Sequence, residues 1–274
     1  MTEIRGRLAL VTGGGRGVGR LLAREPAAKG ARIVLLDVLE KELEESAREL
    51  RAGGATVFPY VLDVTRPEAI QALRERVHAD AGRVEILVNN AGVVFGGAFL
   101  DVPLERHLLT YAVNTLGVVA MTHAFLPDLV ASRAGHLVNV ASASGLVGLP
   151  FGATYSSSKW AVIGFSESIR YELAEQGKQH VVVTTVCPSY INSGMFEGAK
   201  PPLLTPILEP EDLVRQVIAG IEHDEAVILA PAMVKLVPFL KGVLPLPVLD
   251  RVAQLLGLNT SMMGWKGHSG RKPV

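Results

Sequence analysis

The sequence contains a single cysteine and no excess of charge of either sign. Cys187 is the only cysteine among 274 residues, which excludes an internal disulfide and is typical of a reducing compartment. Lys plus Arg and Asp plus Glu are both 27, so nothing in the net charge favours a nucleic-acid partner. Residues 1–5 do not have the pattern of a signal peptide, and we therefore expect a cytoplasmic protein.

Metal ligation and disorder are also poorly supported by the sequence. The seven histidines show no ligand spacing, so we predict no catalytic metal. Hydrophobic residues make up 49% of the chain and charged residues 20%, a composition that allows a large buried core and excludes a disordered chain.

Short apolar segments alternate with helix-like segments through about residue 195. Strands are expected at residues 8–12, 32–37, 56–63, 84–89, 136–142, 181–187 and 226–229. Continuously apolar strands between amphipathic helices are typical of a parallel sheet that is buried on both faces. The sequence therefore predicts an α/β domain over residues 1–230 with one doubly wound parallel sheet and helices on both faces. Residues 231–274 would form an apolar C-terminal extension that ends in a basic tail.

The first expected strand leads directly into a glycine-rich turn, TGGGRGVG, over residues 12–19. Glycine allows a sharp turn and a close approach to a pyrophosphate, and the following helix N-terminus offers free N–H groups. A tight loop without a ligand is the alternative. The position between a strand and a helix, at the start of a βαβ unit, favours a dinucleotide.

Asp37 ends the second expected strand, 18 residues after Gly19. A carboxylate at this point can accept hydrogen bonds from the adenosine ribose and would repel a 2′-phosphate, which favours NAD over NADP. Arg16 offers the opposite interaction, because a basic residue beside the turn can pair with a 2′-phosphate; the alternative for Arg16 is a solvated surface charge. We expect NAD as the cofactor, with NADP less favoured.

Tyr155 and Lys159 lie four residues apart in a segment that we expect to be helical through about residue 175, so their side chains share one face. A phenol has a pKa of about 10, and a nearby cation stabilises the phenolate and lowers that pKa. Tyr155 could then exchange a proton with an alcohol or carbonyl while hydride moves to or from nicotinamide. Such a pair often occurs by chance on a helix surface, so its significance depends on the neighbouring motifs.

Those motifs are present in order. Ser142 follows an apolar strand 13 residues before Tyr155, the sequence NNAG covers residues 89–92, and Asn114 lies 41 residues before Tyr155. With the glycine-rich turn, they resemble the short-chain dehydrogenase/reductase family over about residues 5–195. The resemblance implies a Rossmann fold in which Tyr155 is the general acid/base and Ser142 holds the substrate oxygen. It also implies that Lys159 binds the nicotinamide ribose and adjusts the pKa of Tyr155, and that Asn114 holds a water of a proton relay.

The resemblance also implies a set of cofactor contacts, in which Asp63 and Val64 lie at the adenine. The full set is Thr12, Gly13, Gly15, Arg16, Gly17, Val18, Gly19, Asp37, Asp63, Val64, Asn89, Ala91, Gly92, Tyr155, Lys159, Pro188, Ile191 and Ser193. One motif departs from the family, whose Pro-Gly-x-x-x-Thr is PSYINS at residues 188–193 here. Ser193 keeps a hydroxyl, whereas Ser189 loses the conformational freedom of glycine.

The substrate end is less well specified. Residues 190–212 are rich in Gly and Pro, which suggests a mobile lid, and we expect substrate contacts from Ser144, Met195 and Phe196. Two lysines and several prolines interrupt the apolar residues 233–249, so they cannot form a membrane span. Three roles remain open for this segment: packing against the domain or another subunit, the wall of a lipophilic site, or a patch that contacts a membrane surface peripherally.

The apolar residues 233–249, with the sequence NSGMF at residues 192–196 before them, are similar to the branch of the family that acts on retinoids, sterols and long-chain alcohols. We therefore expect an NAD(P)-dependent oxidoreductase that transfers hydride between nicotinamide and an alcohol or carbonyl of a lipophilic substrate. A catalytically silent NAD(H)-binding regulator or a membrane-surface protein is the alternative. Family resemblance further implies a homodimer or homotetramer, and residues 264–274 are expected to be flexible unless a neighbouring subunit orders them.

Overall fold

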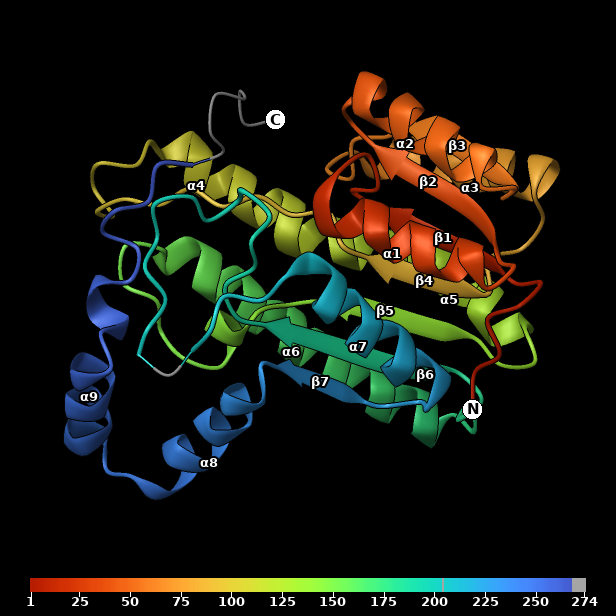
Figure 1. The fold of residues 1–274 in the computed structure, drawn as a ribbon. Coiled ribbons are helices and arrows are strands. Elements are labelled where there is room, and N and C mark those ends of the chain that lie inside the picture. Colours follow the sequence, from red (N-terminus) through yellow and green to blue (C-terminus); the bar gives the residue numbers. More distant parts are fainter. Residues whose placement is uncertain (204, 268–274) are drawn as a thin grey trace.

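A parallel β-sheet forms the centre of the computed structural model, which describes residues 1–203 and 205–267. Within these residues the sheet has seven strands in the order β3-β2-β1-β4-β5-β6-β7 (Figure 1). The strands are β1 (Leu8–Thr12), β2 (Arg32–Asp37), β3 (Val57–Val61), β4 (Ile86–Asn89), β5 (His136–Val140), β6 (Val182–Pro188) and β7 (Val227–Ala230). This confirms the predicted doubly wound fold.

Helices cover both faces of the sheet. One layer contains α1 (Gly17–Ala28), α2 (Glu40–Ala52) and α7 (Pro210–Glu222). The other contains α3 (Pro67–Asp80), α5 (Gly117–Ala131) and α6 (Ala153–Glu175), and α4 (Leu104–Tyr111) joins α5 through the π-helical turn η1 (Ala112–Leu116). After β7 the chain forms α8 (Leu236–Val243) and α9 (Leu246–Leu255), which project beyond the sheet (Figure 1).

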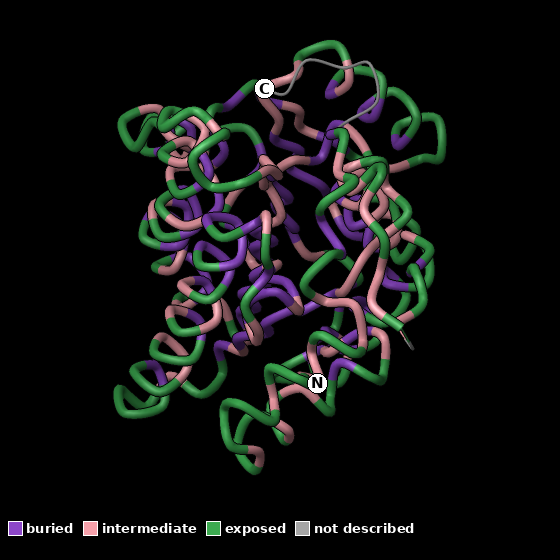
Figure 2. The backbone as a smooth tube through the Cα atoms, turned by 90° about the vertical axis from the view of Figure 1, so that its left-hand side faces the viewer, coloured by how far each residue is buried: buried purple, intermediate pink, exposed green. Residues whose placement is uncertain are grey.

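The strands show why the chain forms this arrangement. Every residue of β1 is buried; Ala9 and Val11 pack beneath the first helix layer, whereas Leu8 and Leu10 pack beneath the second. Successive strand side chains point to opposite faces, so a strand between two helix layers must be apolar throughout. Figure 2 shows the buried residues concentrated in the interior and the exposed ones on the outer helix turns.

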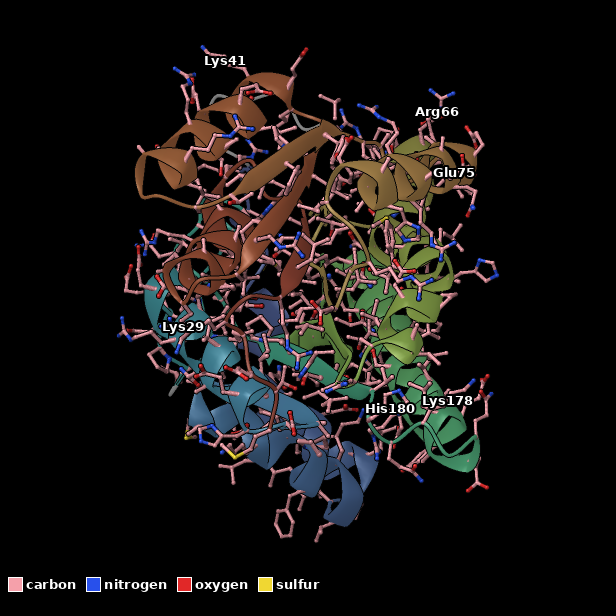
Figure 3. The ribbon with its side chains drawn as sticks, turned by 90° about the vertical axis from the view of Figure 1, so that its right-hand side faces the viewer. Lys29, Lys41, Arg66, Glu75, Lys178 and His180 are labelled. Carbon is pink, nitrogen blue, oxygen red and sulfur yellow. The ribbon has the colours of Figure 1, made fainter. Side chains whose placement is uncertain are left out.

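The sheet changes direction between β1 and β4, which lie side by side although α1, β2, α2, β3 and α3 separate them in the chain. The crossovers leave β1 toward one edge and β4 toward the other, which opens a crevice at the carboxyl ends of these strands. Lys29, Lys178 and His180 precede β2 and β6 and lie at the opposite, amino ends, on the side that faces the viewer in Figure 3. The crevice and these three residues therefore lie on opposite sides of the molecule.

The helical run Leu104–Ala131 is long and apolar enough, by length and composition, to cross a membrane. Its inner side chains Met121, Phe125 and Leu129 pack in the core beneath the sheet. The run therefore serves as a core helix of this fold.

Some element ends differ from the expected ones. β5 ends at Val140 instead of residue 142, because Ser142 is extended and its Oγ accepts the Ser144 N–H at the start of a short 3-10 turn, η2 (Ala143–Gly145). Two further 3-10 turns are η3 (Ala232–Lys235) and η4 (Leu258–Thr260). Residues 268–274, which hold most of the expected basic tail, lie outside the described residues.

Candidate active site

The glycine-rich turn lies at the carboxyl end of β1 and can only be built from glycine at several positions. Gly13 and Gly17 have φ values of +65° and +55°, in the left-handed region. A Cβ on Gly19 would lie 1.9 Å from the Gly13 carbonyl oxygen, so the first turn of α1 packs directly against the loop. This brings the free N–H groups of the helix N-terminus to the crevice, where an anionic pyrophosphate fits.

Thr12 supports the neighbouring loop instead of contacting the crevice. Its Oγ1 accepts the backbone N–H groups of Asn90 and Ala91 at 2.9 and 3.0 Å, and the Asn90 amide donates to the Thr12 carbonyl at 3.0 Å. Asn90 also lines the cavity at the carboxyl ends of the strands, a role that the NNAG motif did not indicate. Asn89 was expected there, but its side chain is buried and donates to Thr122 and Asn139, because β4 alternates its side chains between the two faces.

A cavity of about 660 Å³ runs along the carboxyl ends of the strands. Most of the residues expected at the cofactor line it: Gly13, Arg16, Gly17, Val18, Gly19, Asp37, Asp63, Val64, Ala91, Gly92, Tyr155, Lys159, Pro188, Ile191 and Ser193. Thr12, Gly15 and Asn89 do not. The length of the cavity and its glycine floor fit a dinucleotide, since side chains at Gly13 and Gly19 would meet backbone atoms.

Asp37 marks one end of this cavity. Its Oδ2 accepts the Gly15 N–H at 2.9 Å and its Oδ1 accepts the Leu39 N–H at 3.0 Å. These bonds fix the carboxylate at the end of β2, and each oxygen keeps a further lone pair for a ribose hydroxyl. Gly15 therefore acts on the site through Asp37, and a Cβ there would lie only 2.9 Å from Oδ2.

Tyr155 and Ser142 lie at the other end. Tyr155 is in the first turn of α6 and is buried, with its ring edge-to-face against Phe196 at a centroid distance of 5.6 Å. Burial raises the pKa of Tyr155 to about 12, and a hydrogen bond with Ser142 opposes this rise. The pKa of Tyr155 thus lies above its ordinary value and not below it, because loss of solvation dominates at a buried phenol.

Lys159 is also buried and is held by a backbone group. Its Nζ donates to the Val140 carbonyl at 2.8 Å and lies 5.9 Å from the centroid of the Tyr155 ring. Burial lowers the pKa of Lys159 to about 8. The ammonium therefore lines the cavity beside the phenol without an ion-pair partner within the described residues.

Asn114 is completely buried in the π-helical turn η1 and does not line the cavity. Its Oδ1 accepts the Val93 N–H at 2.8 Å, and its Nδ2 donates to the Val93 carbonyl at 2.9 Å and to Ser158 Oγ at 3.0 Å. A π-helical turn often marks a functional position. Here it turns Asn114 toward the loop after β4, next to Gly92, which does line the cavity.

A second, smaller cavity of about 150 Å³ continues from the same residues. Ser142, Tyr155, Ser189 and Phe196 line both cavities. Ser144 lines only the second cavity, and its Oγ donates to Ser142 Oγ at 3.0 Å. Met195 lines the first cavity, and Phe196 stands between the two. The far wall comes from Val237, Val252 and other apolar residues of the C-terminal extension.

The C-terminal residues 256–266 also hold the expected lid in place. Backbone N–H groups of Lys200 and Leu203 donate to the carbonyls of Ser261 and Leu256, and that of Lys266 donates to Glu197. Trp265 donates its indole N–H to the Met195 carbonyl at 3.1 Å and packs on Gly96, where a Cβ would lie 2.8 Å from its ring. This clasp between the lid and residues 256–266 was not predicted, since three of its four hydrogen bonds join backbone groups and leave no side-chain pattern.

Comparison with known proteins now identifies the family. A family model described as short chain dehydrogenase matches residues 7–202. The chain belongs to the short-chain dehydrogenase family. The glycine turn, the loop after β4, Ser142, Tyr155 and Lys159 all fall within the matched residues. The protein is accordingly an NAD(P)-dependent oxidoreductase that acts on CH–OH groups, as the sequence predicts.

Similar members of the short-chain dehydrogenase family include two vertebrate enzymes. The chain is 38% identical over 269 residues to Epidermal retinol dehydrogenase 2 from Mus musculus, covering 97% of this chain and 87% of that protein. It is 38% identical over 246 residues to Estradiol 17-beta-dehydrogenase 11 from Homo sapiens, covering 89% and 81%. A solved short-chain dehydrogenase/reductase from Burkholderia phymatum in complex with NAD matches with a TM-score of 0.81 and 27% identity over all of both chains.

Proposed function

We propose that this protein oxidises a lipophilic alcohol to the corresponding carbonyl compound with NAD as the hydride acceptor. The observation that carries the proposal is the meeting of two cavities at one phenol: Tyr155 lines both the long cavity that fits a dinucleotide and the smaller apolar one. The similar proteins named for retinol and estradiol support an apolar alcohol of retinoid, sterol or long-chain type.

The residues divide the chemistry between them. A bound nicotinamide cofactor supplies the group that accepts or returns hydride. Ser142 would hold the substrate oxygen, and Tyr155 would remove or return the hydroxyl proton. Lys159 would contact the nicotinamide ribose and place a positive charge beside the phenol. Asn114 would hold a relay water near Gly92.

NAD is proposed over NADP because of Asp37. Its carboxylate lines the adenosine end of the cavity and is fixed by two backbone N–H groups. A fixed negative charge there would repel a 2′-phosphate. Arg16 also lines the cavity and is the residue that could pair with a 2′-phosphate.

Turnover of a panel of alcohols tests the proposal. Retinol, estradiol and a long-chain primary alcohol are each supplied with NAD or NADP, and wild type is compared with Tyr155→Phe. We expect NAD-dependent turnover of at least one of them and a loss of about 10²–10⁴-fold in the variant.

Asp37→Ala should relax the discrimination against NADP. Asp37→Asn keeps the size of the side chain but removes its charge, so it tests whether the charge alone causes this discrimination. Tight NADH binding without turnover on any alcohol or carbonyl would instead support a silent regulator.

We also propose a homo-oligomer. An exposed apolar stripe follows the outer face of α4, η1 and α5, and its members are Leu104, Leu108, Tyr111, Leu116 and Val119. The π-helical turn shifts the register by one residue, which keeps Leu116 on the face that begins at Leu104. An exposed patch of this kind supports contact with a second copy across a two-fold axis.

A further inference from the structure

Helices α8 and α9 expose several large apolar side chains. Neither helix contains a buried residue. On α8, Leu236, Phe239 and Val243 recur at i, i+3 and i+7 and lie on one exposed face. Leu246 at the start of α9 follows Val243 by three residues and is 69% exposed. We call these four exposed side chains, Leu236, Phe239, Val243 and Leu246, the α8–α9 surface.

The opposite side of the same helices forms the wall of the smaller cavity. Val237 of α8, and Val252 and Leu256 of α9 and its C-cap, line that cavity together with Tyr155. Only one helix layer therefore separates the α8–α9 surface from the reacting phenol. Figure 1 shows both helices standing away from the sheet beside the lid, and their exposed side chains indicate that no other layer of the described part of the chain covers their outer side.

The charge of this region indicates which kind of partner it binds. The described residues 231–267 contain four Lys or Arg and a single acidic residue, Asp250, whereas the whole chain has zero net charge; Lys241 is turned inward over the Trp160 ring. Lys235 and Arg251 are exposed beside the apolar face. A second copy docked face to face would bring like charges together, which is unfavourable. An exposed apolar patch with a cationic rim complements an anionic lipid surface.

We infer that the α8–α9 surface binds the surface of an anionic lipid bilayer and that the lipophilic alcohol passes from the bilayer into the smaller cavity. Phe239 and Leu246 would enter the acyl boundary, and Lys235 and Arg251 would contact the headgroups. Both helices are short and each contains a proline, so they would lie in the interface instead of crossing it. The substrate part of this inference rests on the proposed function, whereas the bilayer part does not.

Vesicle flotation of the full chain tests the bilayer part. The probes are vesicles of phosphatidylcholine alone and of phosphatidylcholine mixed with phosphatidylglycerol. We expect binding to the mixed vesicles, weakened about 30-fold by the pair Lys235→Gln and Arg251→Gln, because each cation near the surface contributes about a fivefold effect. The pair Phe239→Ser and Leu246→Ser should also weaken binding at least tenfold.

A matched control removes two exposed apolar side chains elsewhere, in Leu100→Ser with Val227→Ser, and should leave flotation unchanged. NADH binding and the circular dichroism spectrum check that every variant is folded. Equal flotation of wild type and both α8–α9 variants would overturn the inference. So would a concentration-dependent dimer that the Phe239→Ser and Leu246→Ser pair dissociates, since it would assign the surface to a second copy.

Kinetics separate this inference from the proposed function. For an alcohol embedded in anionic vesicles, the α8–α9 variants should raise KM at least tenfold, whereas kcat/KM for a short water-soluble alcohol stays at the wild-type value. Flotation without any alcohol turnover would contradict the proposed function and leave the bilayer contact standing. Turnover of embedded alcohol with the same KM in every variant would overturn the passage from the bilayer while the proposed function stands.

Discussion

Tyr155 and Lys159 are adjacent, buried and shifted in opposite directions from their ordinary pKa values. Burial disfavours the phenolate and also the ammonium, so the pKa of Tyr155 rises to about 12 and that of Lys159 falls to about 8. Tyr155 therefore carries its proton at neutral pH in this structure. This state suits proton donation to a carbonyl, and alcohol oxidation requires the deprotonated form.

These directions predict opposite pH dependences for the two directions of the reaction. Alcohol oxidation should become faster as pH rises, because a larger fraction of Tyr155 is phenolate. Carbonyl reduction should stay level through neutral pH and fall only as the phenol loses its proton. Initial rates from pH 6 to 10 test this, with Lys159→Met expected to shift the oxidation profile to higher pH. An oxidation rate that falls between pH 7 and 9 while the protein stays folded would contradict the assignment.

His136 is a buried titratable residue outside the active site. It is hydrogen-bonded to Thr2 and Thr184, and burial lowers its pKa from 6.5 to about 4. The unfolded chain therefore binds this proton at a higher pH than the folded chain does. Its contribution to the free energy of unfolding is complete above about pH 6.5 and is lost as pH falls toward 4.

We expect wild type to lose about 2 kcal/mol of unfolding free energy between pH 7 and pH 5 through His136. His136→Gln should be less stable at pH 7 but nearly free of this loss. Urea unfolding at the two pH values measures both quantities. Equal losses in wild type and variant would show that another group titrates instead.

At the scale of elements, the strands and glycine turn were predictable and the C-terminal elements were not. A strand buried on both faces must be apolar throughout, and a turn with positive φ needs glycine, so both leave a direct trace in the sequence. In residues 233–249, both the side that lines the cavity and the exposed side are apolar, so the sequence pattern does not show which side faces inward. The sequence therefore left three roles open for this segment.

The same reasoning applies to individual site residues. Gly13 and Asp37 follow from the strand ends that carry them, whereas Asn89 was misplaced by one position relative to Asn90. Strand alternation turns Asn89 into the core, and the Thr12 hydroxyl holds the following backbone at the cavity. Such a one-residue difference depends on tertiary hydrogen bonds that the motif alone does not encode.

The clasp gives a prediction at the element scale. Trp265→Ala removes the hydrogen bond to Met195 and the packing on Gly96, so residues 190–208 should become more mobile. We expect faster limited proteolysis of these residues and a KM for a large alcohol raised about tenfold, from the loss of one hydrogen bond and its apolar contact. The KM for NAD should change little.

Met263→Ala is the matched control, because Met263 is exposed and is two residues from Trp265. It should leave proteolysis and KM at wild-type values. Unchanged proteolysis in Trp265→Ala would show that the clasp does not hold the lid.

At the scale of the whole molecule, two exposed apolar surfaces lie on different elements and have different proposed partners. The stripe on α4, η1 and α5 is proposed to meet a second copy, and the α8–α9 surface a lipid bilayer. Leu108→Glu should therefore shift the protein toward the monomer in light scattering coupled to gel filtration, because it buries a charge in the contact. Val61→Glu, at an exposed strand end, should leave the mass unchanged. An unchanged oligomer in Leu108→Glu would remove this face from the contact.

The central claim is that the site around Tyr155 transfers hydride between an alcohol carbon and nicotinamide. The most direct measurement supplies wild type with NAD and an alcohol deuterated at the carbinol carbon and analyses the reduced cofactor by mass spectrometry. We predict reduced nicotinamide that carries the deuterium, formed about 10²–10⁴-fold more slowly by Tyr155→Phe. Reduced cofactor without deuterium, or equal rates in wild type and Tyr155→Phe, would contradict it.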